Sequence, residues 1–201
     1  MKKKTKIIAA VGAVAVIGAS SIFASMAYLH DSDDVTNTFT IGDVGITLDE
    51  ADVDEYGDAV AGADRVQENE YKLIPGHEYT KDPTVHFEAG SEESYLFVDV
   101  TNEIAPIESE DEDYVSIADQ IVDNGWTKLD GSETVYYQKV AANETSDAID
   151  YVVFSDFKIN KDVEKAGLSG YEGKSIEINA YAIQADGFDT AADAWDALND
   201  Y

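Results

Sequence analysis

The sequence predicts an all-β protein: an antiparallel β-sandwich of jelly-roll type, with short helical insertions and a short C-terminal helix. From about residue 35 onward, apolar and polar residues alternate with the two-residue period of half-buried strands. Turns rich in Gly and Asp join the strand-like segments, and the strand–helix–strand alternation of a parallel sheet is not seen. Seven or so strands arranged in this way indicate an antiparallel sandwich or a jelly roll.

The alternation places the expected strands in seven segments. Within 94–104, Leu96, Val98 and Val100 share one face. Segment 175–185 is partly apolar on both faces, so we expect it at the centre of a sheet. The expected strands lie at 36–49, 70–74, 84–89, 94–104, 134–141, 151–159 and 175–185.

Two segments, 113–124 and 190–201, have apolar residues at helical spacing. In the second, Thr190 and Asp193 resemble a capping box, with Asp in place of the usual Glu. We expect this terminal helix to dock Trp195 onto the sandwich. Two polar segments are expected to be irregular: a long loop at 51–70 and a solvated acidic run at 108–113.

The N-terminal segment has the three parts of a secretory signal peptide. A lysine-rich start is followed by apolar and small residues at 7–24, and then by a small-x-small cleavage site at 25–27. We therefore expect a signal peptide at 1–27, cleavage between Ala27 and Tyr28, and a single secreted domain at 28–201. A retained transmembrane anchor is the alternative, because an apolar stretch of about 18 residues is at the short limit of a membrane span.

Removal of residues 1–27 takes away four lysines and leaves 9 basic residues against 42 acidic ones, a net charge of −33. A chain of this charge repels nucleic acid and anionic lipid, so we expect neither as a partner and no membrane attachment after cleavage. The chain contains no cysteine, which excludes disulfides, thiolate metal sites and cysteine nucleophiles. This composition suits a protein exported by a Gram-positive bacterium.

Four elements along the chain form a recognisable set. The Ala27-Tyr28 pair at the cleavage region is followed by Asp31. A Thr-Phe-x-x-Gly strand and a Leu-x-Pro-Gly-x-x-x-x-Lys-Asp element come next, and 175–188 forms a late strand. The matching residues of the two middle elements are Thr38, Phe39, Gly42, Leu73, Pro75, Gly76, Lys81 and Asp82. Together the elements resemble the TasA/camelysin family of Gram-positive exported proteins, whose signals are cut by the dedicated peptidase SipW.

The resemblance implies a jelly-roll domain that is a secreted biofilm-matrix protein or a subunit of extracellular fibres. Such fibres are built by donor-strand exchange, in which the N-terminal strand of one subunit completes the sheet of the next. The expected partners are therefore further copies of this chain or related matrix subunits. Alternatively, 28–48 is the first strand of its own sandwich and the protein is a monomeric surface binding module. The candidate donor strand is 28–48. Its apolar side chains would insert into the groove of the neighbouring subunit; they are Phe39, Ile41, Val44, Ile46 and Leu48.

Camelysin-type relatives carry the label of metallo-endopeptidase, which directs attention to the histidines. A zinc protease of this kind needs His-Glu-x-x-His on a helix. Here His77-Glu78 is followed by Lys81 where the second His should stand. His86 lies in a strand pattern, on the face expected to be exposed to solvent, and His30 lies beside the cleavage region. We expect no enzyme, no catalytic residue and no cofactor, with a secreted metallo-endopeptidase as the alternative.

Calcium is a further candidate ligand because carboxylates are abundant in this chain. The ordered Asp-x-Asp-x-Asp-Gly loop of a dedicated site is missing. We therefore expect no specific metal site and at most weak, diffuse surface binding of calcium. The clusters that could supply oxygen ligands are Asp31, Asp33 and Asp34, and Glu108, Glu110, Asp111, Glu112 and Asp113.

Overall fold

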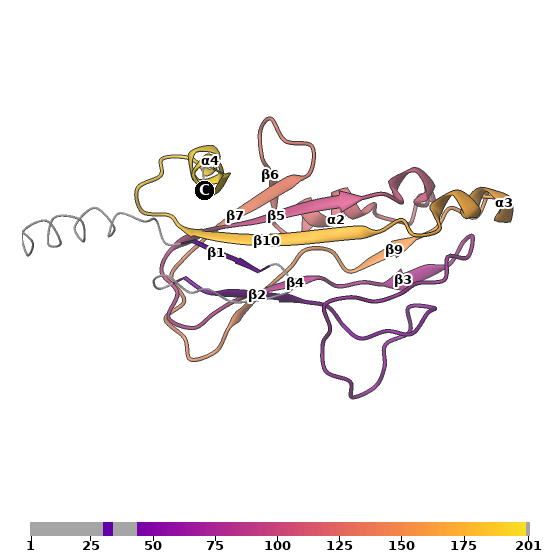
Figure 1. Cartoon of the computed structure of the whole chain (residues 1–201), viewed down its shortest axis with the longest axis horizontal. Helices are drawn as coiled ribbons and strands as arrows, with labels where there is room; N and C mark the ends of the chain where they lie inside the picture. The colour runs from indigo at the N-terminus through magenta and orange to yellow at the C-terminus, as the bar shows by residue number, and fades with distance from the viewer. Residues whose placement is uncertain (1–29, 34–43, 200–201) are drawn as a thin grey trace, which may run out of the picture.

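The computed structural model describes residues 30–33 and 44–199, which form antiparallel sheets with a few short helices (Figure 1). The all-β prediction is confirmed. The predicted signal peptide lies outside the described residues. The sheets have the strand orders β1-β10-β5-β7-β6, β2-β4-β8 and β3-β9. The strands are β1 (His30–Asp33), β2 (Ile46–Asp49), β3 (Glu78–Thr80), β4 (Thr84–Phe87), β5 (Ser94–Asn102), β6 (Thr127–Lys128), β7 (Val135–Val140), β8 (Ile149–Val152), β9 (Asp156–Lys158) and β10 (Ile176–Gln184).

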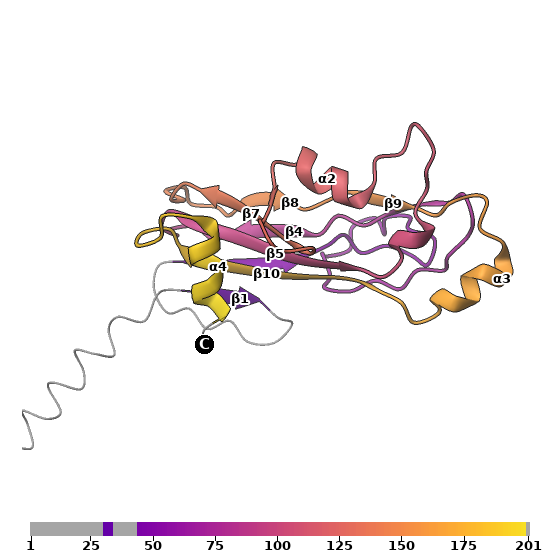
Figure 2. The same cartoon turned by 90° about the horizontal axis from the view of Figure 1, so that it is seen from above.

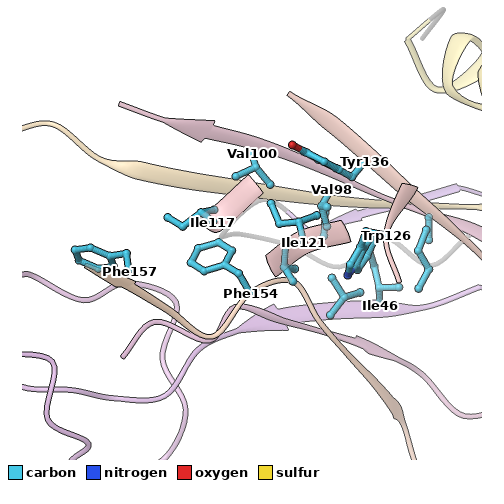
Figure 3. Packing of buried hydrophobic residues seen from close by; sticks show 14 of the residues in the cluster. Ile46, Val98, Val100, Ile117, Ile121, Trp126, Tyr136, Phe154 and Phe157 are labelled. Atoms are coloured by element: carbon cyan, nitrogen blue, oxygen red, sulfur yellow. The ribbon is translucent and has the colours of Figure 1, made fainter. Parts of the chain in front are cut away.

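One large hydrophobic core lies between two layers of sheet (Figures 1 and 3). The five-stranded sheet forms one layer, and the two smaller sheets lie opposite it. Leu96 and Val98 of β5 point into this core and meet Ile46 and Phe87 from the facing layer; all four are buried. Because the apolar area removed from water is the main source of stability, this shared core is what joins the two layers.

Strands β5 and β10 form the centre of the larger sheet and pair along nine residues each. The alternation of β5 sends Leu96 and Val98 into the main core and Tyr95 and Phe97 to the outer face. Ala180 and its neighbours in β10 alternate in the same way. The predicted central position of segment 175–185 is therefore confirmed, since β10 lies between β1 and β5.

The described helices are short, with α4 the longest at nine residues. Ser116 caps α2: its hydroxyl accepts a hydrogen bond from Asp119 N at 3.2 Å, which satisfies a free N–H of the first turn. Ile117 and Ile121 of α2 then enter the main core. The helical segments are α2 (Ile117–Asp123), α3 (Lys165–Leu168) and α4 (Ala191–Asn199), with 3₁₀ turns η2 (Ala105–Ile107) and η3 (Ser169–Tyr171).

The terminal helix α4 covers the outer face of the five-stranded sheet, at the opposite end from α3 (Figure 2). Thr190 accepts a hydrogen bond from Asp193 N at 3.1 Å, so the predicted capping pair is confirmed. The ring of Trp195 packs against Phe97, with centroids 5.1 Å apart, and against Tyr181 at 5.4 Å. The docking of Trp195 is also confirmed, and it gives β5 and β10 their second buried face.

Two of the predicted strands differ from the structure. Segment 70–74 is not a strand: the hydroxyl of Tyr79 accepts a bond from Ile74 N at 2.7 Å and donates one to Lys72 O at 2.6 Å, in place of a ladder. Segment 151–159 is not one strand but the end of β8 and all of β9, which belong to different sheets. The chain passes from one of the two smaller sheets to the other at Val153 and Phe154, both fully buried.

Candidate functional site

The edge of the central strand β10 is the feature that bears most directly on assembly. On one side β10 pairs with β5 along nine residues, from Ile176 to Gln184. On the other side, within the described residues, it pairs with β1 from His30 opposite Ile183 to Asp33 opposite Ala180. In the part of the chain that the structure describes, β1 is thus the edge strand of this sheet, and it comes from the N-terminal part of the chain.

The residues of the candidate donor strand fall into different parts of the fold. Val44 and Ile46 are buried in the main core, and Leu48 packs partly buried against it. Strand β2, which contains Ile46 and Leu48, pairs with β4 in the layer opposite β1. Phe39 and Ile41, like Ala27 and Tyr28 of the cleavage region, lie outside the described residues. The described parts of 28–48 therefore serve both layers of their own chain.

The element that runs from Pro75-Gly76 to Lys81-Asp82 makes contacts that stabilise the described fold. Gly76 has a φ of 75°, which favours glycine, and its N–H bonds to Ile159 O at 2.9 Å. Asp82 accepts a bond from Ala51 N at 2.7 Å, and Lys81 forms a buried ion pair with Glu50. These contacts fasten the loop at 51–70 to the region between β3 and β4.

Arg65, the only arginine of the chain, also attaches the loop at 51–70 to the rest of the fold. Its Nη1 donates to the Asp82 carboxylate at 2.9 Å, and Nε donates to the carboxylate of Asp49 on β2. Its Nη2 donates to Thr84 Oγ1 and to Asp82 O, both at 3.0 Å. The planar guanidinium therefore joins the loop, the end of β2 and the start of β4 with one side chain.

Replacing Arg65 with Lys is expected to lower the free energy of unfolding by about 1–3 kcal/mol, because an ammonium cannot reproduce the planar fork. Urea denaturation of both proteins measures the difference. The matched control is Lys72→Arg, an exposed substitution in the neighbouring segment, with an expected change within about 0.5 kcal/mol. A stability of Arg65→Lys equal to that of the control would show that the fork is not needed.

His86 on β4 joins the three strands of the smaller sheet. Its Nε2 lies 2.8 Å from Asp49 Oδ1 on β2, and its Nδ1 lies 2.6 Å from Asp150 Oδ1 on β8. Burial of the ring disfavours its charge, but the hydrogen bonds and charges of Asp49 and Asp150 outweigh burial, so the pKa of His86 is raised. The imidazolium, with two N–H donors, is the form that satisfies both carboxylates. It does not face open solvent, as the strand pattern had suggested, because both neighbouring strands supply an acid.

Replacing His86 with Gln is expected to destabilise the protein by about 1–2 kcal/mol at pH 6 and by less at pH 9. A raised folded-state pKa adds stability that is complete below the unfolded value, about 6.5, and that disappears as the pH rises through the folded value. Urea denaturation of both proteins at the two pH values measures the difference. An equal loss at pH 6 and pH 9 would contradict a charged role for His86.

The described histidines do not converge. His77 follows the Pro-Gly turn, and its Nε2 lies 2.8 Å from Tyr56 O, while His86 is held between Asp49 and Asp150. Across residues 30–33 and 44–199, the structure has no group of three or more His, Asp or Glu placed to hold a metal ion.

A surface depression of about 290 Å³ contains the carboxylates of Glu78 and Asp156. Burial, and then the charge of Glu78, raises the pKa of Asp156.

The acidic run at 108–113 is more ordered than a solvated run should be. Glu108 Oε1 accepts bonds from Tyr114 Oη at 2.8 Å and from Ile117 N at 3.0 Å, so it helps to start α2. Asp111 binds Lys161 and Lys158, which together lower its pKa to about 2. The prediction of a fully solvated run is wrong at these two positions, because Glu108 binds groups at the start of the following helix and Asp111 binds lysines far away in sequence.

Comparisons of this chain with protein-family models, with curated proteins and with solved structures gave no match. In the part of the chain that the structure describes, none of the helices has both the length and the apolar character needed to cross a membrane. The functional interpretation therefore rests on the sequence elements and on the geometry described above.

Proposed function

We propose that this protein is an exported structural protein of the cell surface or biofilm matrix that assembles into fibres by exchange of its N-terminal strand. In this proposal a SipW-type peptidase cuts between Ala27 and Tyr28, and the mature domain is a jelly-roll sandwich. The antiparallel pairing of the described strands and the core between two layers support this architecture. The observation that supports assembly most directly is that β1, from the N-terminal part of the chain, is the edge strand beside β10 in the described sheet.

The exchange follows from the position of β1 at the edge of the sheet. Among the described strands, β1 is paired on one side, with β10, whereas β10 is paired on both sides. When β1 leaves, β10 presents unpaired N–H and C=O groups, which are a template for a strand from another chain. A second copy supplies that strand, and because this head-to-tail contact does not close on itself, it produces a filament.

The placement of Val44 and Ile46 divides the candidate donor strand. Both residues are buried in the main core, with 2% and 1% of their surface exposed, so moving them would open that core. We propose that residues 28–43 exchange, whereas Val44, Ile46 and Leu48 stay with their own domain. Deletion of residues 28–43, which leaves Val44 in place, therefore tests assembly without removing these core residues.

The decisive experiment compares filament formation by the exported protein and by the double variant Asp31→Pro/Ser32→Pro. Neighbouring residues of a strand point their N–H groups in opposite directions, so one of these two prolines must remove a bond to the strand beside it. Electron microscopy is expected to show filaments for the unchanged protein and none for the double variant. Since the mature charge is −33, filaments are expected to increase with salt.

The matched control is Asp31→Ala/Ser32→Ala, which removes the same side chains but keeps both N–H groups. It is expected to form filaments as the unchanged protein does. Circular dichroism of all three proteins checks that the domain is still folded. Equal filaments from the proline variant would disprove strand exchange, and a folded monomer in every case would favour the surface binding module. Casein hydrolysis that chelation abolishes would favour the metallo-endopeptidase.

A further inference from the structure

Three side chains with complementary chemistry meet beneath the loop at 51–70. Glu50 places its two carboxylate oxygens between an amine and an amide. Its Oε2 lies 2.5 Å from Lys81 Nζ, and its Oε1 accepts a bond from Asn69 Nδ2 at 2.9 Å. Lys81 and Asn69 are therefore held at the two ends of one carboxylate, although they come from different segments of the chain.

The amide of Asn69 has a defined orientation. Its Oδ1 accepts a bond from Val53 N at 3.0 Å, and its Nδ2 also donates to Ala51 O at 2.9 Å. Because a backbone N–H needs an acceptor and a backbone C=O needs a donor, the reversed amide would lose both bonds. The carbonyl of Asn69 is thus polarised by an N–H, and its NH₂ group faces the carboxylate.

Glu50 and Lys81 are shielded from water, and Asn69 is half-buried beside them. Glu50 is 3% exposed and Lys81 is 8% exposed, which is unusual for residues of these types. The ring of Tyr71 lies over Lys81 Nζ at 6.0 Å from its centroid. Burial, followed by the charges of Glu50 and Asp82, raises the pKa of Tyr71, so this neighbour stays uncharged. The carboxylate of Asp82 is engaged by Arg65 and Ala51 N, which leaves Glu50 as the acid of the cluster.

We propose that Lys81 and Asn69 form an intramolecular isopeptide bond, in a self-catalysed reaction in which Glu50 carries the proton. Glu50 takes a proton from the Lys81 ammonium, which gives a neutral amine beside a carboxylic acid. The amine attacks Asn69 Cγ, the new C–N bond forms, the bond from Cγ to Nδ2 breaks, and ammonia leaves. Of the five protons on the two nitrogens, one stays on the new amide, three leave with ammonia and one stays on Glu50.

Each neighbour has a role in this reaction. A neutral amine is a nucleophile, and the proton transfer to Glu50 that produces it also removes two buried charges. Glu50 can deliver a proton to Nδ2, to which it is already hydrogen-bonded, as a general acid. Val53 N–H donates to the oxygen on which negative charge develops, in the manner of an oxyanion hole. Holding both reactants on one carboxylate removes most of the entropy cost of their encounter.

The product would connect the loop at 51–70 covalently to the residue that follows β3. This inference is independent of the proposed function, because the reaction needs one folded chain and no assembly. It also gives a specific role to Lys81, which the sequence singled out only as part of a resemblance.

Intact-mass spectrometry of the purified full chain, denatured after folding, tests the proposal. The measured mass is expected to fall below the sequence mass by one ammonia. Trypsin is expected to cut after Arg65 and Lys72 but not after the acylated Lys81. The digest should therefore contain 66–72 joined to 73–128, in place of separate peptides 73–81 and 82–128.

Substitutions of Lys81 and Glu50 test whether these residues have the proposed roles in the reaction. Lys81→Arg keeps the positive charge and the trypsin site, and Glu50→Gln removes the proton acceptor; both are expected to have the full sequence mass. Lys72→Arg, at an exposed lysine outside the cluster, is the matched control and should still lose ammonia. If a variant fails to fold, the digest of the unchanged protein decides the question by itself.

Two results would overturn the proposal. The first is a full sequence mass for the unchanged protein, which would make the cluster a buried ion pair alone. The second is a loss of ammonia with normal cleavage after Lys81. The Asn124-Gly125 pair can lose ammonia by cyclising to a succinimide, and the digest separates this from the isopeptide because Lys81 would then be cut.

Discussion

Replacing Trp126 with Ala is expected to lower the free energy of unfolding by about 3–5 kcal/mol, the usual cost of removing a large buried aromatic side chain. Trp126 is 1% exposed and lies in the main core beside Ile121 and Ile46 (Figure 3). Its indole Nε1 donates to Val152 O at 2.9 Å. The ring therefore connects the end of α2 to strand β8 of the smaller sheet, and its loss leaves a cavity and an unpaired carbonyl.

Urea denaturation of the unchanged protein, Trp126→Ala and Trp126→Phe separates these two contributions. Phe keeps most of the ring but cannot donate to Val152 O, so the expected loss is about 1–3 kcal/mol. Domains of this size have total stabilities of about 5–15 kcal/mol, so Trp126→Ala should remove a large share. If Ala and Phe cost the same, the hydrogen bond, and not the packing, would be the main contribution of Trp126.

The long strands could be predicted from the sequence because burial determines them. β5 and β10 are buried on both faces, so apolar residues such as Leu96 and Phe97 mark them whichever face is considered. The capping pair at Thr190 was also predictable because it depends on residues of one short helix, and the apolar spacing of that helix marked Trp195 as the residue that packs against the sheet. The sequence pattern thus identified the elements whose own residues determine their structure, namely the long buried strands and the capped terminal helix.

The elements that the alternation missed depend on contacts distant in sequence. Strands β8 and β9 looked like one strand because Val153 and Phe154, where the chain passes from one smaller sheet to the other, are both buried and apolar. Strand β3 has one buried residue, Tyr79, which is too little to form a pattern. Its ladder becomes favourable only when β9 is placed beside it by the rest of the fold.

The polar clusters were beyond prediction for the same reason. In a chain with 42 acidic residues, nothing in the sequence distinguishes Glu50 from the others. Its partners Asn69 and Lys81 lie 19 and 31 residues away. His86 is similar: the alternation placed it on an exposed face, and only the register of β2 and β8 brings Asp49 and Asp150 to it.

Replacing Phe157 with Ala is expected to cost about 3–5 kcal/mol as well, with its effect concentrated in the two-stranded sheet. Phe157 of β9 is opposite Tyr79 of β3, and the two rings stack with centroids 4.8 Å apart and planes at 13°. Tyr71 meets Phe157 edge to face at 5.1 Å. The Tyr79 hydroxyl binds Lys72 O and Ile74 N, so this stack also positions the segment before the Pro-Gly turn.

Hydrogen exchange distinguishes this variant from Trp126→Ala. Two strands of three residues are not stable without such packing, so Phe157→Ala should increase amide exchange in β3, β9 and 71–74 before the domain unfolds. Trp126→Ala should increase exchange around α2 and β8 instead. Phe157→Leu, which keeps apolar volume in the stack, is the matched control and should cost less than about 1.5 kcal/mol. If Phe157→Ala instead increased amide exchange evenly across the domain, the prediction would be contradicted. That result would mean that β3 and β9 do not open separately from the larger sheet.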